Sequence, residues 1–181
     1  MAKGGFMRQK KRVLIVILGI FCCFGIANGQ TIPTFDYVII FNIPSMSAKV
    51  IQDNYIMETH RLYNRTLTIG GVISGETMDR FWGLLEDENG NVIWDLIGNI
   101  IWNNRNVNQL TGTKGYIQGS FIYPSADVQI LAGNYIDGTI SHNKKGYSVK
   151  VKAGVNATYA PQYGYGYIAI YNSISGKGNL Y

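Results

Sequence analysis

The longest alternation of apolar and polar residues lies between Tyr147 and Tyr159, and it predicts a β-strand. Every second residue from Tyr147 onward is aliphatic or aromatic, and the residues between them are serine, lysine, glycine, asparagine and threonine. Alternation with a period of two places the two sets on opposite faces of a strand, whereas a helix would mix them. One face of this strand is therefore expected to pack against a core while the other meets solvent.

Further strands are predicted along most of the chain. Asn89-Gly90 favours a type I′ turn, in which both central residues have positive φ, and predicts a hairpin between Arg80–Asp87 and Asn91–Asn103. The other predicted strands are Phe35–Ile43, Leu62–Ser74, Tyr116–Tyr123, Gln129–Ser141 and a tyrosine-rich strand after Pro161, whereas residues 45–61 give no clear pattern and allow a short helix. Glycines within long strands are typical of sheets that coil into barrels. The predicted fold class is all-β, an antiparallel barrel or strongly twisted sheet of about eight strands.

The first 29 residues have the features of a secretory signal. Basic residues up to Arg12 precede an apolar run from Val13 to Ala27, and small residues follow, so cleavage is expected before Gln30. The run of about 15 residues is shorter than the roughly 20 that cross a bilayer as a helix, although an uncleaved anchor stays an alternative. The predicted organisation is a signal peptide (1–29), one all-β domain (30–173) and a flexible Gly- and Ser-rich tail (174–181). The expected location is extracellular or at the cell surface.

Loss of the signal segment changes the charge. The full chain has 16 Lys and Arg against 11 Asp and Glu, and five of the basic residues lie within the first 29. The remaining chain therefore has 11 of each sign and a net charge of zero, which argues against a nucleic-acid partner. Cys22 and Cys23 also lie in this segment, so a disulfide is not expected to hold the domain together.

Motifs for catalysis or metal binding are weak in this sequence. His60 and His142 have no further histidine or cysteine at ligand spacing. The acidic run Glu86–Glu88 lacks the glutamate that an EF-hand needs at its twelfth position. No nucleophile elbow, P-loop or C-x-x-C motif is present. We therefore expect no catalytic residue, no metal and no cofactor.

Aromatic residues and polar positions inside apolar strands are the candidates for binding. Aromatic rings give a large contact area at low entropy cost, and polar groups that converge inside a barrel can orient a ligand. The candidate ligand-binding residues are Tyr163, Tyr165, Tyr167, Tyr171, Trp94, Asp95, Asn134 and Asp137. Asn64 and Asn156 match the glycan acceptor pattern, which matters only in a host that glycosylates exported proteins.

Three functions are compatible with these observations. The favoured one is a secreted or cell-surface, non-enzymatic β-barrel that binds a small molecule, a glycan or a surface protein through an aromatic face or its lumen. The second is an integral outer-membrane-type barrel, because Tyr147 and Tyr159 bracket an apolar face that fits a belt of about 25 Å. The third is a small barrel cyclase or isomerase that acts on an apolar substrate in the lumen. Membrane contact is expected only through the signal segment or, in the second function, through the barrel.

Overall fold

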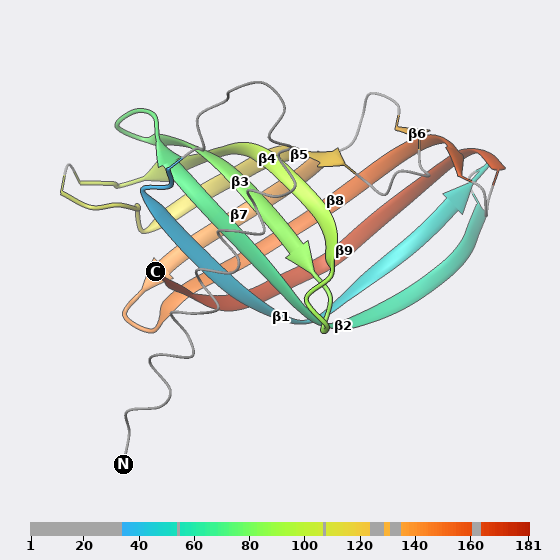
Figure 1. Cartoon of the computed structure of the whole chain (residues 1–181), viewed down its shortest axis with the longest axis horizontal. Helices are drawn as coiled ribbons and strands as arrows, with labels where there is room; N and C mark the ends of the chain where they lie inside the picture. The colour runs from blue at the N-terminus through green and yellow to red at the C-terminus, as the bar shows by residue number, and fades with distance from the viewer. Residues whose placement is uncertain (1–33, 54, 107, 124–128, 131–134, 161–163) are drawn as a thin grey trace, which may run out of the picture. The chain divides into compact units, whose positions relative to one another are not determined.

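The described residues form nine β-strands, all paired antiparallel (Figure 1). The computed structural model describes residues 34–181 except 54, 107, 124–128, 131–134 and 161–163. The strands are β1 (Tyr37–Gln52), β2 (Tyr55–Ile73), β3 (Met78–Glu86), β4 (Val92–Asn103), β5 (Lys114–Tyr123), β6 (Gln129–Ile130), β7 (Tyr135–Asn143), β8 (Gly146–Ala160) and β9 (Gly164–Leu180).

Eight of these strands close into a barrel. Their order around the wall is β7-β5-β4-β3-β2-β1-β9-β8, and β8 pairs back with β7. The short β6 adds two residues to β8 beside the end of β7. The predicted all-β barrel of about eight antiparallel strands is therefore confirmed.

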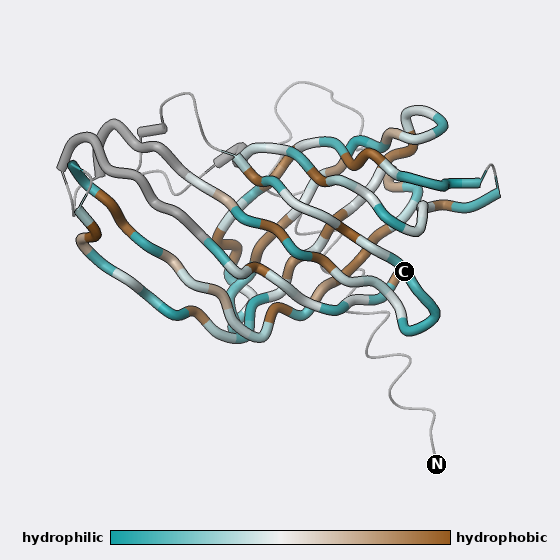
Figure 2. Tube along the Cα trace, turned by 180° about the vertical axis from the view of Figure 1, so that it is seen from behind, coloured by the Kyte–Doolittle hydropathy of each residue, from teal (hydrophilic) through white to brown (hydrophobic). Residues whose placement is uncertain are grey.

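The interior of the barrel is a packed apolar core. Hydropathy alternates along the strands, as Figure 2 shows, and the inward set is buried. The largest fully buried side chains are Trp102, Tyr37, Phe41, Phe81, Ile39, Ile43, Met46, Leu67, Ile69, Leu85 and Leu96. Burial of one such side chain contributes about 2 kcal/mol. On the outer face the polar residues of β8, such as Lys150 and Lys152, are exposed, as the alternation after Tyr147 predicts.

Four neighbouring strands bend along one line, which we name the crease. The crease is defined by Pro44 in β1, Asn64 in β2, Ser173 in β9 and the register shift that follows Val151 in β8. Asn64 and Ser173 have φ values of 53° and 59°, a left-handed conformation that turns the strand direction. The β1–β9 ladder runs from Ile39 opposite Leu180 to Asn42 opposite Lys177, then resumes at Ser47 opposite Asn172.

The crease reverses which residues of β1 face the core. From Ile39 to Ile43 the buried residues are odd-numbered, and after the crease they are even-numbered, as Met46 and Ala48 are. Beyond the crease β1, β2, β8 and β9 continue past the closed part of the barrel, as Figure 1 shows for β1 and β2. Segment 45–61, which gave no clear sequence pattern, is thus strand on both sides of the turn at Asp53.

The turn between β3 and β4 differs from the expected type I′ geometry. Gly90 has a φ of 84°, whereas Asn89 is not in the left-handed region. Instead the Asp87 carboxylate accepts hydrogen bonds from the backbone N–H groups of Asn89 and Asn91 at 2.8 and 2.9 Å. The hydrogen bond from the Asn91 side chain, followed by these backbone bonds, lowers the pKa of Asp87. An aspartate that bonds the backbone two residues ahead outweighed the Asn-Gly preference.

The segment predicted as a flexible tail is instead part of the barrel wall. β9 continues to Leu180 and pairs with both β1 and β8 there. A Cβ on Gly176 would lie 2.1 Å from the carbonyl oxygen of Asn42. Glycine is therefore needed at this position for the close approach of two backbones. The prediction of a flexible tail was wrong because it took the glycines as a sign of flexibility. Residues 35–180 form one compact unit, and the predicted signal segment lies outside the described residues.

Candidate functional site

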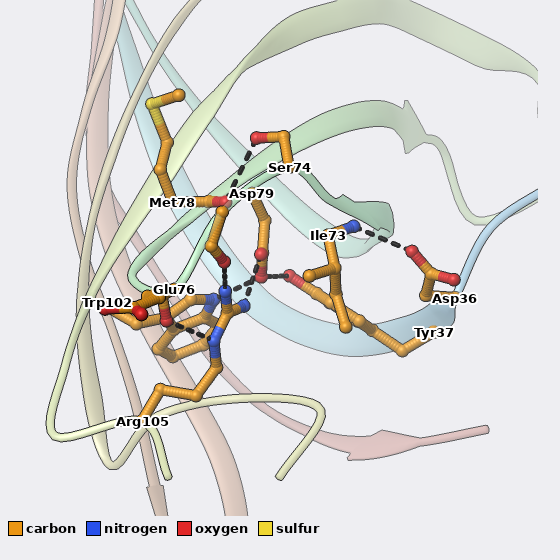
Figure 3. A network of polar contacts seen from close by, with 10 residues as sticks. Asp36, Tyr37, Ile73, Ser74, Glu76, Met78, Asp79, Trp102 and Arg105 are labelled. Carbon is orange, nitrogen blue, oxygen red and sulfur yellow. Dashed lines mark hydrogen bonds and ion pairs between the residues drawn. The ribbon is translucent and has the colours of Figure 1, made fainter. Parts of the chain in front are cut away.

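A buried polar cluster, which we name the clasp, joins β1, β3 and β4 at one end of the barrel (Figure 3). Its members are Tyr37, Asp79, Trp102 and Arg105. The Tyr37 hydroxyl and the Trp102 indole N–H both donate to Oδ2 of Asp79, at 2.7 and 2.6 Å. The guanidinium of Arg105 forms an ion pair with Oδ1 of the same carboxylate.

Local sequence explains how these four side chains meet. Tyr37 is the register partner of Gly71 on β2, and a Cβ at Gly71 would lie 2.1 Å from the Tyr37 ring. The missing side chain lets the ring cross β2 and reach Asp79. Arg105 follows β4 and donates its Nε to the Glu76 carbonyl at 2.8 Å, and another nitrogen of the group donates to the Gly75 carbonyl. The clasp therefore ties the β2–β3 loop to the segment after β4.

The clasp is closed to substrate. The Asp79 side chain is 0% exposed and that of Arg105 is 4% exposed, so each charge faces a partner rather than solvent. Burial raises the pKa of Tyr37, and its hydrogen bond to the Asp79 carboxylate raises it further. The phenol therefore keeps its proton and cannot act as a base near neutral pH. The arrangement suits a structural role, in which the clasp holds the β2–β3 loop against the segment after β4. A buried charge pair persists only when its polar groups are satisfied.

A second polar cluster lies on the outer wall, in a groove of about 570 Å³ at the crease. Its lining residues are Asn42, Pro44, Thr139, Ser141, Ser148, Val149, Lys150, Ser175, Gly176 and Lys177. They come from β1, β7, β8 and β9, the part of the wall that includes the interruption of the β1–β9 ladder. We name this feature the crease groove.

The strand register sets the lysines of the crease groove among hydroxyl groups. Lys150 of β8 lies between Thr139 of β7 and Ser175 of β9, its two register partners. In the adjacent row Lys177 of β9 lies between Ser148 of β8 and Asn42 of β1. Side chains directly across a ladder point to the same face, so both rows present donors outward.

Neither groove lysine has a carboxylate partner among the described residues. The nearby Lys152, by contrast, contacts Asp137 at 3.7 Å. Ser141 and Ser148 share a hydrogen bond of 2.8 Å, which fixes one side of the groove. Lys150 and Lys177 are both exposed, so their ammonium groups are available to an anion.

The wall around the groove is the basic part of the domain. Residues 135–181 contain five lysines and one acidic residue, which gives a net charge of +4. Residues 35–103 contain four basic and nine acidic residues, a net charge of −5. The zero net charge of the chain after residue 29 thus conceals a strong separation of charge, and this separation raises the local concentration of anions at the groove.

The residues predicted to bind a ligand do not form one described site. Trp94 is buried in the core, whereas Asp95 and Asp137 are half-buried on the outer wall, on strands that β5 separates. Burial raises the pKa of Asp95, and its Oδ1 has no hydrogen-bond partner in the described structure. Asp137 accepts a hydrogen bond from Tyr116, which raises the pKa of that tyrosine. The binding role of these residues stays a prediction.

The remaining predicted residues are described only in part. Tyr165, Tyr167 and Tyr171 lie in β9, and the backbone of Tyr171 pairs with Ala48 and Ala153. Asn156 lies in β8 opposite Ile168, and Asn64 is exposed at the crease. The positions predicted at Asn134 and Tyr163 lie outside the described residues.

Neither histidine is a member of the clasp or of the groove lining. The His142 ring stacks on Tyr147 with centroids 4.3 Å apart, and His60 contacts Glu58 at 2.5 Å. Within the described ranges, no group of three or more His, Cys, Asp or Glu side chains is placed to hold a metal ion.

Sequence reasoning missed both clusters. For the clasp a signal was present, because Asp79 shares the inward parity of Phe81 and Leu85 and had to find a buried partner. For the groove, Lys150 was visible on the polar parity of its strand. Lys177, however, lay in the segment predicted as a tail, and the register that pairs β8 with β9 was not visible.

Comparison of the chain with family models, with curated proteins and with solved structures gave no match. In the part of the chain that the structure describes, no helix has the length and hydropathy to cross a membrane.

Proposed function

We propose that this protein is an exported, non-enzymatic binding domain that holds an anionic glycan in the crease groove. One observation carries the proposal: two exposed lysines without carboxylate partners lie in a groove whose other polar groups are hydroxyls and an amide. An ammonium group binds carboxylate or sulfate, and the hydroxyl and amide groups suit the hydroxyls of a sugar. The volume of about 570 Å³ lies within the usual range for ligand sites.

The burial pattern supports this function over the membrane-barrel alternative. A membrane barrel has an apolar outer face and a polar interior. Here the interior is apolar, while Lys114, Lys150 and Lys177 are exposed on the outside. The packed core also gives less support to a ligand or a reaction in the lumen, because the buried side chains fill that space. The proposed export rests on the sequence of residues 1–29.

Titration calorimetry of the full chain with a hexamer of galacturonic acid tests the proposal. We expect binding that weakens with added salt, and no binding of the neutral galactose hexamer. The double variant Lys150→Ala/Lys177→Ala should bind at least about tenfold more weakly, because two charge-assisted hydrogen bonds are lost. Lys152→Ala is the matched control, since Lys152 lies on the same face of β8 but pairs with Asp137.

Equal binding of the two hexamers would reject an anionic ligand. Unchanged affinity in the Lys150→Ala/Lys177→Ala variant would reject the groove as the site. Binding of a single-stranded oligonucleotide in preference to the uronate hexamer would assign the groove to a nucleic acid and overturn the glycan proposal.

A further inference from the structure

One long stretch of strand backbone has a partner on a single side. Residues 66–73 of β2 pair with β3, but the ladder with β3 stops at Thr66. Residues 55–65 pair with β1 alone in the described structure. We name this stretch the β2 edge.

The β2 edge also carries the most exposed large apolar side chains that the structure describes. Tyr55, Ile56, Met57 and Tyr63 are between 51 and 75% exposed, and the other exposed large hydrophobic residues are at most 46% exposed. Native proteins usually shorten or cover an edge strand, because its free backbone groups template pairing with another chain. A long edge with apolar side chains therefore indicates a site that another strand covers.

We propose that the β2 edge pairs antiparallel with the same edge of a second copy, about a two-fold axis at Thr59. Such an axis stands normal to the sheet, so residues opposite each other must share a face and their numbers must add to an even total. With Thr59 opposite itself, that total is 118. Ile56 of one copy then faces Leu62 of the other, and Tyr55 faces Tyr63.

Charge selects this register over its neighbours. In the register centred on Thr59, Glu58 of one copy faces His60 of the other, and the two side chains share a hydrogen bond within each chain as well. An axis at Glu58 would oppose Glu58 to itself, and like charges directly opposite destabilise a sheet. An axis at His60 would oppose Glu58 to Leu62. The register at Thr59 alone among these combines apolar, aromatic and complementary polar pairs.

Site-specific disulfide formation tests both the dimer and its register. In the full chain with Cys22→Ser and Cys23→Ser, the added change Thr59→Cys should give a covalent dimer under mild oxidation. Residues directly opposite in an antiparallel pair have Cα atoms about 4.5 to 5.5 Å apart, within the range that a disulfide spans. Met57→Cys is the matched control, because the two copies of residue 57 would be offset by four residues, about 13 Å along the strand.

Sedimentation of the unmodified full chain measures the assembly directly. We expect a species of twice the chain mass at micromolar concentration. Ile56→Lys should raise the dissociation constant about tenfold, because it sets a charge against Leu62 at two symmetric positions. Ile101→Lys, at an exposed position of β4 away from the edge, should leave it unchanged.

A chain that stays monomeric at these concentrations would overturn the proposal and leave the β2 edge to another partner or segment. Equal cross-linking through positions 57 and 59 would overturn the register. The result is independent of the glycan proposal, since the Lys150→Ala/Lys177→Ala variant should remain a dimer.

Discussion

The clasp and the crease groove hold cationic side chains in opposite environments. Each combines cationic groups with hydroxyl donors, but the cation of the clasp faces a buried carboxylate, while those of the groove face solvent. Arg105 is thus committed to Asp79, and Lys150 and Lys177 remain available to a ligand. Pairing and burial, rather than positive charge itself, separate the part that stabilises this barrel from the part that we propose to bind a ligand.

Truncation of Asp79 should have the largest effect and fall on stability alone. Asp79→Ala leaves the Tyr37 hydroxyl, the Trp102 N–H and the Arg105 charge buried without their acceptor. We expect a loss of about 3–5 kcal/mol in the free energy of unfolding, measured with urea. A loss below about 1 kcal/mol would contradict a structural role for the clasp.

Removal of the Tyr37 hydroxyl should cost less, about 1–2 kcal/mol, because one hydrogen bond to the carboxylate is lost. The phenol has a raised pKa in the folded protein, so the fold favours its protonated form. The contribution is present below the pKa of an unfolded tyrosine, near 10, and is lost as the pH rises above it. Denaturation at stepped alkaline pH should therefore show a shallower decline for Tyr37→Phe than for the wild type. Parallel declines would show that Tyr37 does not titrate with unfolding.

Asp95 is an intermediate case, half-buried and with one oxygen that has no partner in the described structure. Burial raises its pKa, so the ionised form lowers stability at neutral pH. Asp95→Asn should raise the free energy of unfolding at pH 7 by less than about 1 kcal/mol, seen as a slightly higher melting temperature. The gain should disappear as the pH falls below about 4, where the carboxyl is protonated in both states. A destabilised variant at pH 7 would show that the carboxylate has a partner.

The smallest stability effect should come from the groove. Lys150→Ala/Lys177→Ala is expected to change the free energy of unfolding by less than about 0.5 kcal/mol, because both side chains are exposed. The same variant should lose uronate binding. It is thus expected to change binding with little effect on stability, whereas Asp79→Ala should change stability. A large loss of stability in this variant would show that the two lysines also stabilise the fold.

Sequence periodicity was enough to predict the barrel but not its deviations. The alternation after Tyr147 is a local property, and the structure follows it as far as the side chains are described, to Ala153. The reversal of parity at Pro44 was missed because a proline reads as the end of a strand rather than as a bend within one. The Gly-rich segment around Gly176 was misread for a related reason, since one sequence does not show which backbone will approach.

The two polar clusters were hidden for a different physical reason. Tyr37, Asp79 and Arg105 meet only after three separate strands or loops have paired, so no short window contains the clasp. The groove likewise depends on the register that places Ser175 beside Lys150. Such a register is set by the hydrophobic faces of whole strands, and single residues do not reveal it.

The seam between β1 and β9 has a consequence for the order of folding. Ile39 pairs with Leu180, so the first strand of the wall can complete its ladder only after almost the whole domain has been synthesised. Contacts of such high sequence separation slow folding and leave β1 exposed in the meantime. Until then the backbone groups of β1 that face β9 stay open to pairing with another chain.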